Sequence, residues 1–249
     1  MIIYPKLRKG GENVKKICAL LAVSLFFFLV ACSQEASEEE VIENVLNSHR
    51  DVNQYAANFN IDTSDVAKTI SHNIEVNLTE DPVALHQILT IEADGEESSV
   101  NTYRVNDEIY TQEEDNPWGK REAEEDEPLF TPSYRDVVSV LENVIDYAEF
   151  DSEGGTYTFS YEGFEREIYE AFEGPFNILL GGSDIADEDM SLGFTFEVNK
   201  SDYYIENLEY NLSVENETGT VNINIQVNYD DINDINEIEV PDEAIEETS

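Results

Sequence analysis

The chain has 249 residues and a mass of 28.2 kDa, and its 13 Lys and Arg residues face 56 Asp and Glu residues, which gives a formal charge of −43 and a pI near 4.1. Nucleic acid is excluded as a ligand, because binding it requires basic side chains that neutralise phosphates. Anionic lipid headgroups are disfavoured for the same reason. Hydrophobic residues make up 41% of the chain, which suffices for one folded domain of about 200 residues.

The N-terminus carries a segment typical of an exported protein. Lys15 and Lys16 precede an uncharged run from Ile17 to Val30. As a helix at 1.5 Å per residue this run spans roughly 21 Å, less than the roughly 30 Å of a bilayer core, which favours a signal peptide over a permanent span. The segment Leu29-Val30-Ala31-Cys32 resembles the bacterial lipobox, in which diacylglycerol is attached to the cysteine and the signal is cut before it. The alternative is an ordinary signal peptide with a chance cysteine.

Processing at this site sets the domain organisation. We expect a lipoprotein signal peptide over residues 1–31, a lipidated tether over 32–37, one domain over 38–241 and an acidic, frayed tail over 242–249. Cys18 leaves with the signal, so Cys32 is the one cysteine of the mature chain and a disulfide framework is excluded. We expect Cys32 to be the lipid-attachment residue, which anchors the protein to the outer side of the cell membrane of a Gram-positive bacterium.

The first 13 residues add nothing that a signal peptidase requires, and we expect that they are not translated. Gly10-Gly11-Glu12 can be encoded by a purine-rich ribosome-binding sequence, and Val14 by GTG, an alternative start codon. The other interpretation is a longer but harmless region ahead of the signal core.

Acidic residues dominate the mature chain even more than the precursor. Five of the 13 basic residues and one of the 56 acidic residues lie in residues 1–31, so the mature chain carries a formal charge of −47. Such an excess lowers stability unless salt screens it, and it is typical of a bacterium from a salty or alkaline habitat. The alternative is a calcium-binding surface, although the acidic runs 184–189 and 230–234 lack the glycine and terminal glutamate of an EF-hand loop.

The first half of the domain predicts one helix and then a series of strands. Ser37 and Glu40 form a capping-box pattern for a helix that reaches about Arg50, and an acidic loop is expected over Glu113–Glu127. Alternating apolar and polar residues predict strands between them. These strands lie near Tyr55–Ile61, Ile70–Leu78, Val83–Ile91, Ser99–Val105 and Glu108–Gln112.

The second half predicts two helices and four strands. Ser133 caps a helix that reaches about Ala148, and a helix near Phe164–Phe172 ends before Gly174-Pro175. The strict alternation of the last strands is typical of antiparallel strands with one wet face. The predicted strands lie near Tyr157–Tyr161, Leu192–Val198, Leu208–Val214 and Val221–Tyr229.

The lipobox, the capped helix and several strand and turn segments together resemble the LolA-like lipoproteins of Gram-positive bacteria, an uncharacterised family. The matching segments are Asn73–His86, Tyr103–Tyr110, Trp118-Gly119-Lys120 and Val240–Ala244, and the resemblance covers nearly all of the mature chain. It implies an α+β fold in which a strongly curved antiparallel β-sheet, a half-barrel, wraps around a few α-helices. Such a sheet leaves an apolar concavity that can hold acyl chains. Gram-positive relatives have no outer membrane to serve, so a carrier function does not follow from the resemblance alone.

No pattern in the chain predicts catalysis, and we expect no enzyme, no cofactor and no metal site. The sequence holds no Gly-x-Ser-x-Gly elbow, P-loop or dinucleotide-binding fingerprint. His49, His72 and His86 lack the spacing of metal ligands. His72 and His86 are expected to face each other across a hairpin that turns at Pro82, but they lack a third ligand.

Two functions from different classes remain open, both for a protein expected to be a monomer. In the first, the concave face of the sheet binds a lipid or other hydrophobic ligand. In the second, the same residues only pack against the helices, and the protein is a cell-surface adaptor or envelope-stress component without a small ligand. The alternation alone selects the ligand-binding candidates, and a register error of one residue would move them to the other face. They are Leu89, Ile91, Phe194, Phe196, Tyr210, Leu212, Ile223 and Ile225.

The charge predicts a fold that depends on salt. Raising sodium chloride from low concentration to about 1 M, where the Debye length is about 3 Å, should raise the thermal midpoint because surface carboxylates no longer repel one another. Thermal melts followed by circular dichroism measure this, and a midpoint that is flat or falls with salt contradicts it.

Overall fold

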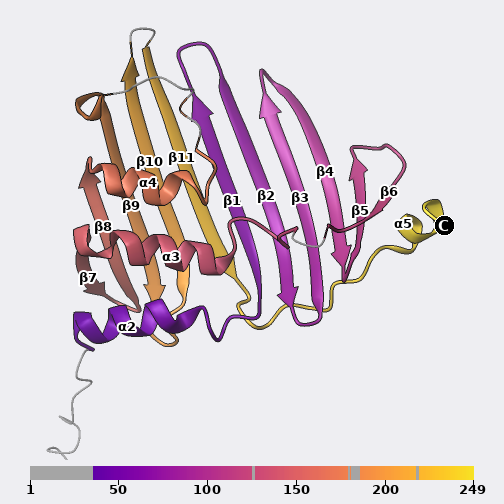
Figure 1. Ribbon diagram of the computed structural model, residues 1–249, viewed down its shortest axis with the longest axis horizontal. Coiled ribbons are helices and arrows are strands. Elements are labelled where there is room, and N and C mark those ends of the chain that lie inside the picture. The colour runs from indigo at the N-terminus through magenta and orange to yellow at the C-terminus, as the bar shows by residue number, and fades with distance from the viewer. Residues whose placement is uncertain (1–35, 125–126, 179, 181–185, 217–218) are drawn as a thin grey trace, which may run out of the picture. The chain divides into compact units, whose positions relative to one another are not determined.

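The computed structural model of the protein describes residues 36–124, 127–178, 180, 186–216 and 219–249 (Figure 1). It divides into two compact units, Met1–Glu40 and Val41–Ser249. The expected signal peptide and Cys32 lie outside the described residues. The second unit contains all the strands of the sheet.

One antiparallel sheet of eleven strands forms the framework, in the order β6-β5-β4-β3-β2-β1-β11-β10-β9-β8-β7. Most neighbours in the sheet are also neighbours in sequence, and the exception is β1, which pairs with β11. The sheet is curved and does not close on itself. The strands are β1 (Gln54–Ser64), β2 (Thr69–Glu80), β3 (Val83–Ala93), β4 (Glu96–Val105), β5 (Glu108–Glu113), β6 (Gly119–Glu122), β7 (Glu149–Glu153), β8 (Thr156–Gly163), β9 (Met190–Asn199), β10 (Ile205–Asn216) and β11 (Gly219–Asp230).

Side chains alternate between two faces along each strand, and the register places the apolar sets together. Phe59 of β1 pairs with Val227 of β11, which pairs with Leu208 of β10, which pairs with Phe196 of β9. All four side chains are 0% exposed. We call the face that carries them the inner face and the opposite one the outer face.

The helices are few and short. Two of them, α3 and α4, lie against the inner face of β1 and of β8–β11, whereas no labelled helix lies in front of β2–β6 (Figure 1). We call strands β2–β6 the helix-free half of the sheet, because neither α3 nor α4 covers their inner face; α5 packs on the outer face, against Tyr110 of β5. The helices are α2 (Glu38–Ser48), α3 (Tyr134–Val144), α4 (Arg166–Glu173) and α5 (Asp242–Glu247), with 3-10 turns η1 (Ile145–Tyr147) and η2 (Asp187–Asp189).

Local sequence fixes where α3 begins. The Ser133 side chain accepts a hydrogen bond from the backbone N–H of Asp136, and the Asp136 carboxylate accepts one from the backbone N–H of Ser133. This capping box satisfies two N–H groups that the first turn leaves without partners. Val137, Leu141 and Val144 then recur at helical spacing and are fully buried.

The predicted fold class is therefore confirmed: a strongly curved antiparallel sheet with a few helices. Within it, two strands were not predicted. β6 lies inside the expected acidic loop, and β7 follows the helix that Ser133 caps. Both are short edge strands with charged residues, so neither has the apolar alternation that reveals a half-buried strand.

The expectation of a frayed tail after residue 241 is wrong. Residues 242–247 form α5, and Ala244 is 0% exposed in a cluster with Tyr110 and Trp118. The backbone N–H of Trp118 donates to Glu247 Oε2 at 2.8 Å. The acidic composition gave no sign of this contact, because Ala244 alone anchors the short helix against the aromatic rings.

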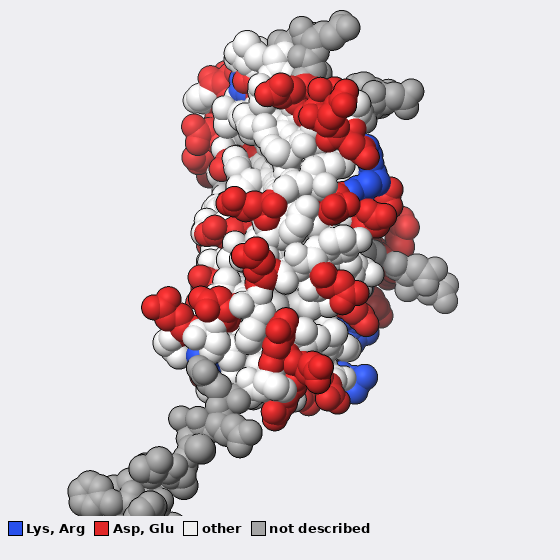
Figure 2. Space-filling model, turned by 90° about the vertical axis from the view of Figure 1, so that its left-hand side faces the viewer, with Lys and Arg blue, Asp and Glu red and all other residues white. Residues whose placement is uncertain are grey.

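On the face that Figure 2 shows, acidic side chains are widely spread, with few basic ones among them. Three basic residues of the described ranges form salt bridges: Lys120 Nζ lies 2.7 Å from Glu108 Oε1, Arg121 contacts Glu127, and Arg166 contacts Asp187. Among the residues that the structure describes, no helix combines the length and apolarity required to span a membrane.

The C-terminal contact can be tested with the single tryptophan of the chain. Ala244→Glu places a carboxylate against Tyr110 and Trp118, so α5 should detach and the fluorescence of Trp118 should shift to longer wavelength as water reaches the ring. Ile245→Glu is the matched control, because Ile245 is the next residue and is 44% exposed. Equal emission spectra for the two variants contradict the assignment.

Candidate functional site

The inner face under α3 and α4 is a packed aromatic core. Phe172 of α4 stacks on Tyr210 of β10 with ring centroids 4.1 Å apart, and it also lies against Phe194 and Phe196 of β9. Stacked and tilted rings at such distances add to the free energy of burial. Among the described residues, these rings pack against one another rather than line an open cavity.

Six of the eight predicted ligand-binding residues lie in this packed core. Phe194, Phe196, Tyr210, Leu212 and Ile225 are 2% exposed or less, and Ile223 is 6% exposed. The alternation predicts their face correctly, since all of them share the inner face. The strand pattern alone does not reveal that helices cover these residues.

The other two predicted residues, Leu89 and Ile91 of β3, lie on the same inner face in the helix-free half. Leu89 pairs with Ile74 of β2 on one side and with Val100 of β4 on the other. Antiparallel partners share a face, so these side chains form an apolar row across three strands. We call Ile74, Leu89, Ile91 and Val100 the apolar row; each of its members is half-buried.

A cavity of about 710 Å³ lies on the inner face at the other end of these strands. Its strand side is formed by Leu78, Val83 and Arg104, and its other wall by residues 127–131, Ser133, Asp136, Gly174 and Pro175. The volume falls in the range of small-molecule sites, about 300–1,000 Å³. Most of these lining residues could not be predicted from the sequence, because residues 127–131 belong to an irregular segment without periodicity.

Arg104 holds that segment over the strands. Its Nη1 donates to the backbone oxygens of Glu127 and Pro128, each at 3.1 Å. Phe130 follows, 9% exposed, with its ring 5.1 Å from that of Phe59. An arginine side chain and an aromatic anchor thus fix the wall opposite the strands.

The charges around the cavity are mostly negative. Three acidic residues, Glu80, Glu127 and Asp136, line the cavity, and Arg104 is the basic residue of its lining. Arg121 donates to both oxygens of Glu127 and lowers the pKa of that carboxyl to about 2, so Glu127 is ionised at any physiological pH. A ligand with an anionic headgroup meets repulsion here, whereas an uncharged one does not.

Buried tyrosines keep the covered half of the sheet uncharged. The hydroxyl of Tyr134 accepts a hydrogen bond from the backbone N–H of Ile205 at 2.9 Å, and burial raises its pKa to about 12. Burial also raises the pKa of Tyr229 well above its ordinary value. These phenols stay protonated at physiological pH and therefore act as packing groups.

The histidines do not form the pair considered from the sequence. His72 lies on the inner face opposite Ile91, whereas His86 pairs with Asn77 and lies on the outer face, so the two imidazoles do not face each other. His86 stacks on Tyr103 with centroids 4.2 Å apart, and burial lowers its pKa. In the described part of the chain no group of three or more His, Cys, Asp and Glu is arranged to hold a metal ion.

This architecture defines a class of protein: an open, curved antiparallel sheet with helices over half of one face. The chain belongs to a family of unknown function, DUF6612, whose pattern matches residues 37–249. No curated protein matches it.

Solved structures with some likeness to the chain share little of its sequence. Lipoprotein LppX of Mycobacterium tuberculosis is 12% identical with a TM-score of 0.42, over 82% of this chain and 100% of that one. Rv2717c of M. tuberculosis is 9% identical with a TM-score of 0.26, over 75% and 97%. A DUF1329 family protein of Desulfovibrio piger is 7% identical with a TM-score of 0.25, over 77% and 90%. At such scores these likenesses carry no argument about function.

Proposed function

We propose that the protein is a membrane-anchored extracytoplasmic lipoprotein that binds a lipid or other hydrophobic ligand on the inner face of the helix-free half of its sheet. The observation that carries this proposal is the combination of the apolar row with the cavity of about 710 Å³ on the same face. A side chain that only filled a core would be covered, as Phe196 and Leu208 are. Leu89 and its neighbours instead remain half-buried.

The shape of the site suits an elongated apolar ligand. The row and the cavity lie along the same strands: Leu78 and Ile74 share the inner face of β2, and Val83 and Leu89 share that of β3. At about 3.3 Å per residue, the six steps from Val83 to Leu89 span about 20 Å of strand. An acyl chain laid along this strip covers the half-exposed side chains, and its burial supplies about 25 cal/mol per Å² of apolar area.

The charge of the site selects among such ligands. The acidic side chains at the cavity favour an uncharged or cationic headgroup over an anionic one, in accord with the acidity of the whole chain. Neutral lipids with one or two acyl chains are the class that we propose.

Two adjacent residues of β3 provide a matched test. Leu89→Glu places a charge on the inner face, whereas Ile88→Glu places the same charge on the outer face of the same strand, and both wild-type side chains are half-buried. Native mass spectrometry of protein purified from cells, from residue 33 onward, should show lipid bound to the wild type and to Ile88→Glu. The occupied fraction of Leu89→Glu should be at least fivefold lower, because a carboxylate opposes burial of an acyl chain.

Two results of this comparison would oppose the proposal. Equal occupancy in the two variants would mean that the inner face is not the binding surface. A wild type that carries no ligand under any lipid supplement would favour the adaptor function.

Attachment to the membrane is tested at Cys32. Two acyl chains on one glycerol contribute about 0.8 kcal/mol per buried methylene, which gives stable attachment where a single chain is marginal. Cys32→Ala should therefore leave the precursor uncut or move the protein from the membrane fraction to the medium. Labelling with a radioactive fatty acid checks this, and a variant labelled as strongly as the wild type would contradict it.

A further inference from the structure

The outer face of the sheet carries an unusual number of asparagines. Asparagine is depleted in β-strands, where β-branched and aromatic residues are preferred. Among the described residues, eleven strand asparagines share the outer face, spread over β1, β2, β4, β9, β10 and β11. They are Asn58, Asn60, Asn73, Asn77, Asn101, Asn199, Asn207, Asn211, Asn222, Asn224 and Asn228.

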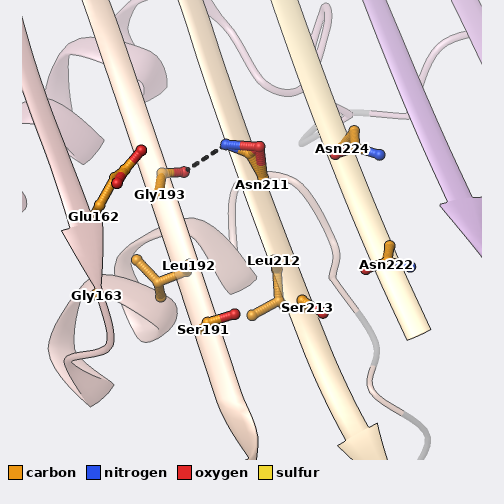
Figure 3. A pocket seen from close by; sticks show the side chains of 10 residues that line it. All are labelled: Glu162, Gly163, Ser191, Leu192, Gly193, Asn211, Leu212, Ser213, Asn222 and Asn224. Atoms are coloured by element: carbon orange, nitrogen blue, oxygen red, sulfur yellow. Dashed lines mark hydrogen bonds between the residues drawn. The ribbon is translucent and has the colours of Figure 1, made fainter. Parts of the chain in front are cut away.

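A hollow of about 490 Å³ lies on this face across β8–β11 (Figure 3). One row of cross-strand partners passes through it, Glu162–Gly193–Asn211–Asn224, and a second row, Ser191–Ser213–Asn222, lies two residues further along the strands. The rows are about 7 Å apart, and neighbouring strands are about 4.8 Å apart. The hollow is thus floored by a regular grid of hydrogen-bonding side chains.

Gly193 makes the depression in this grid. Any side chain there would stand between Glu162 and Asn211, and even a Cβ would lie 3.2 Å from the backbone oxygen of Tyr161. Without it, a ligand can rest against the backbone of β9 with a carboxylate on one side and an amide on the other (Figure 3).

The amides in the hollow are free to bind, whereas others on the face are engaged with neighbouring side chains. Asn73 donates to Asn60 at 2.7 Å, and Asn60 donates to Asn58 at 2.8 Å. In the hollow, the amide nitrogen of Asn211 reaches only the backbone oxygen of Gly193 at 3.4 Å, which is long for a hydrogen bond. Within the described residues, the side chains of Asn222 and Asn224 form no hydrogen bond.

Aromatic side chains adjoin the polar grid at the sheet edge. β7 pairs with β8 only as far as Ser160, so Tyr161, Glu162 and Gly163 form an open edge. A second hollow of about 630 Å³ shares Glu162, Gly193 and Asn211 with the first and adds Tyr147 and Glu149. It also reaches Tyr161, whose side chain lies on the inner face beside Phe194 and contacts the ring of Tyr147. Tyr147 is 37% exposed, which is rare for a large ring in this structure.

The two adjoining hollows together form what we call the groove. We propose that this groove on the outer face is a binding site for a saccharide. Each amide offers a donor and an acceptor side by side, which matches neighbouring hydroxyls that both donate and accept, and the Glu162 carboxylate accepts from two of them. The ring of Tyr147 offers an apolar face to the C–H side of a sugar ring. No basic residue lines either hollow, so phosphates and other anions are not favoured. The two carboxylates, Glu149 and Glu162, are too few for a calcium ion, and the described residues hold no group of three or more such ligands.

The test is calorimetric titration of the full chain in a zwitterionic detergent with chitotetraose, cellotetraose and maltotetraose. We expect saturable binding of at least one tetrasaccharide. In Asn211→Ala/Asn224→Ala the Kd should rise at least tenfold, because two free amides are lost. Asn60→Ala/Asn73→Ala is the matched control: it removes two asparagines from neighbouring strands of the same face, outside the groove, and should bind as the wild type does.

Tyr147→Ala is a second test variant. It leaves the two rows of strand residues unchanged and should also weaken binding. Thermal melts of all variants establish that they fold. The proposal is overturned if none of the three tetrasaccharides binds the wild type. It is also overturned if folded groove variants bind the sugar as tightly as the control does.

Discussion

The constraint on which the structure depends is that short helices must cover a wide sheet. Eleven strands at intervals of about 4.8 Å make a sheet about 48 Å wide, whereas α3, with its 11 residues at about 1.5 Å each, is about 16 Å long. Helices α3 and α4 therefore complete a core over one half, centred on Phe172 and the aromatic residues of β9 and β10. In the other half Ile74, Leu89 and Val100 stay half-buried, whereas Val76, Leu78 and Leu85 are buried. The cavity lined by residues 127–131 lies on the same face.

The two faces of the sheet consequently offer different chemistry on one rigid framework. The inner face of β2–β4 presents Ile74, Leu89 and Val100, which gain free energy by leaving water. The outer face of β9–β11 presents amides and hydroxyls. These groups contribute free energy of binding only when a ligand replaces their bound water with hydrogen bonds of good geometry. Because strands expose alternate residues to opposite faces, neither surface competes with the other for sequence positions.

The sequence predicts the strands and their faces well where alternation is strict. It predicts the exposed ligand-binding residues less well. The faces of β9–β11 follow from the alternation around Phe194, Tyr210 and Ile225, since a slip of one residue would move these side chains into water. A slip of two residues keeps the same faces, so the alternation does not select the exact pairing. Which apolar residues are covered depends on where α3 and α4 pack, and no local pattern contains that information. The same holds for α5, whose burial depends on Trp118, 126 positions before Ala244.

The open sheet leaves two unpaired edges, and their composition governs how copies of the protein behave when they are crowded on one surface. β6 has four residues and β7 five, which limits any ladder between molecules to a few hydrogen bonds. Two β7 edges brought together would oppose Glu149, Asp151 and Glu153 with one another. Lys120 and Arg121 of β6 would suit those acids, but Glu108 and Glu127 of their own molecule already hold them. The length and charge of these edges therefore disfavour edge-to-edge polymerisation of the sheet.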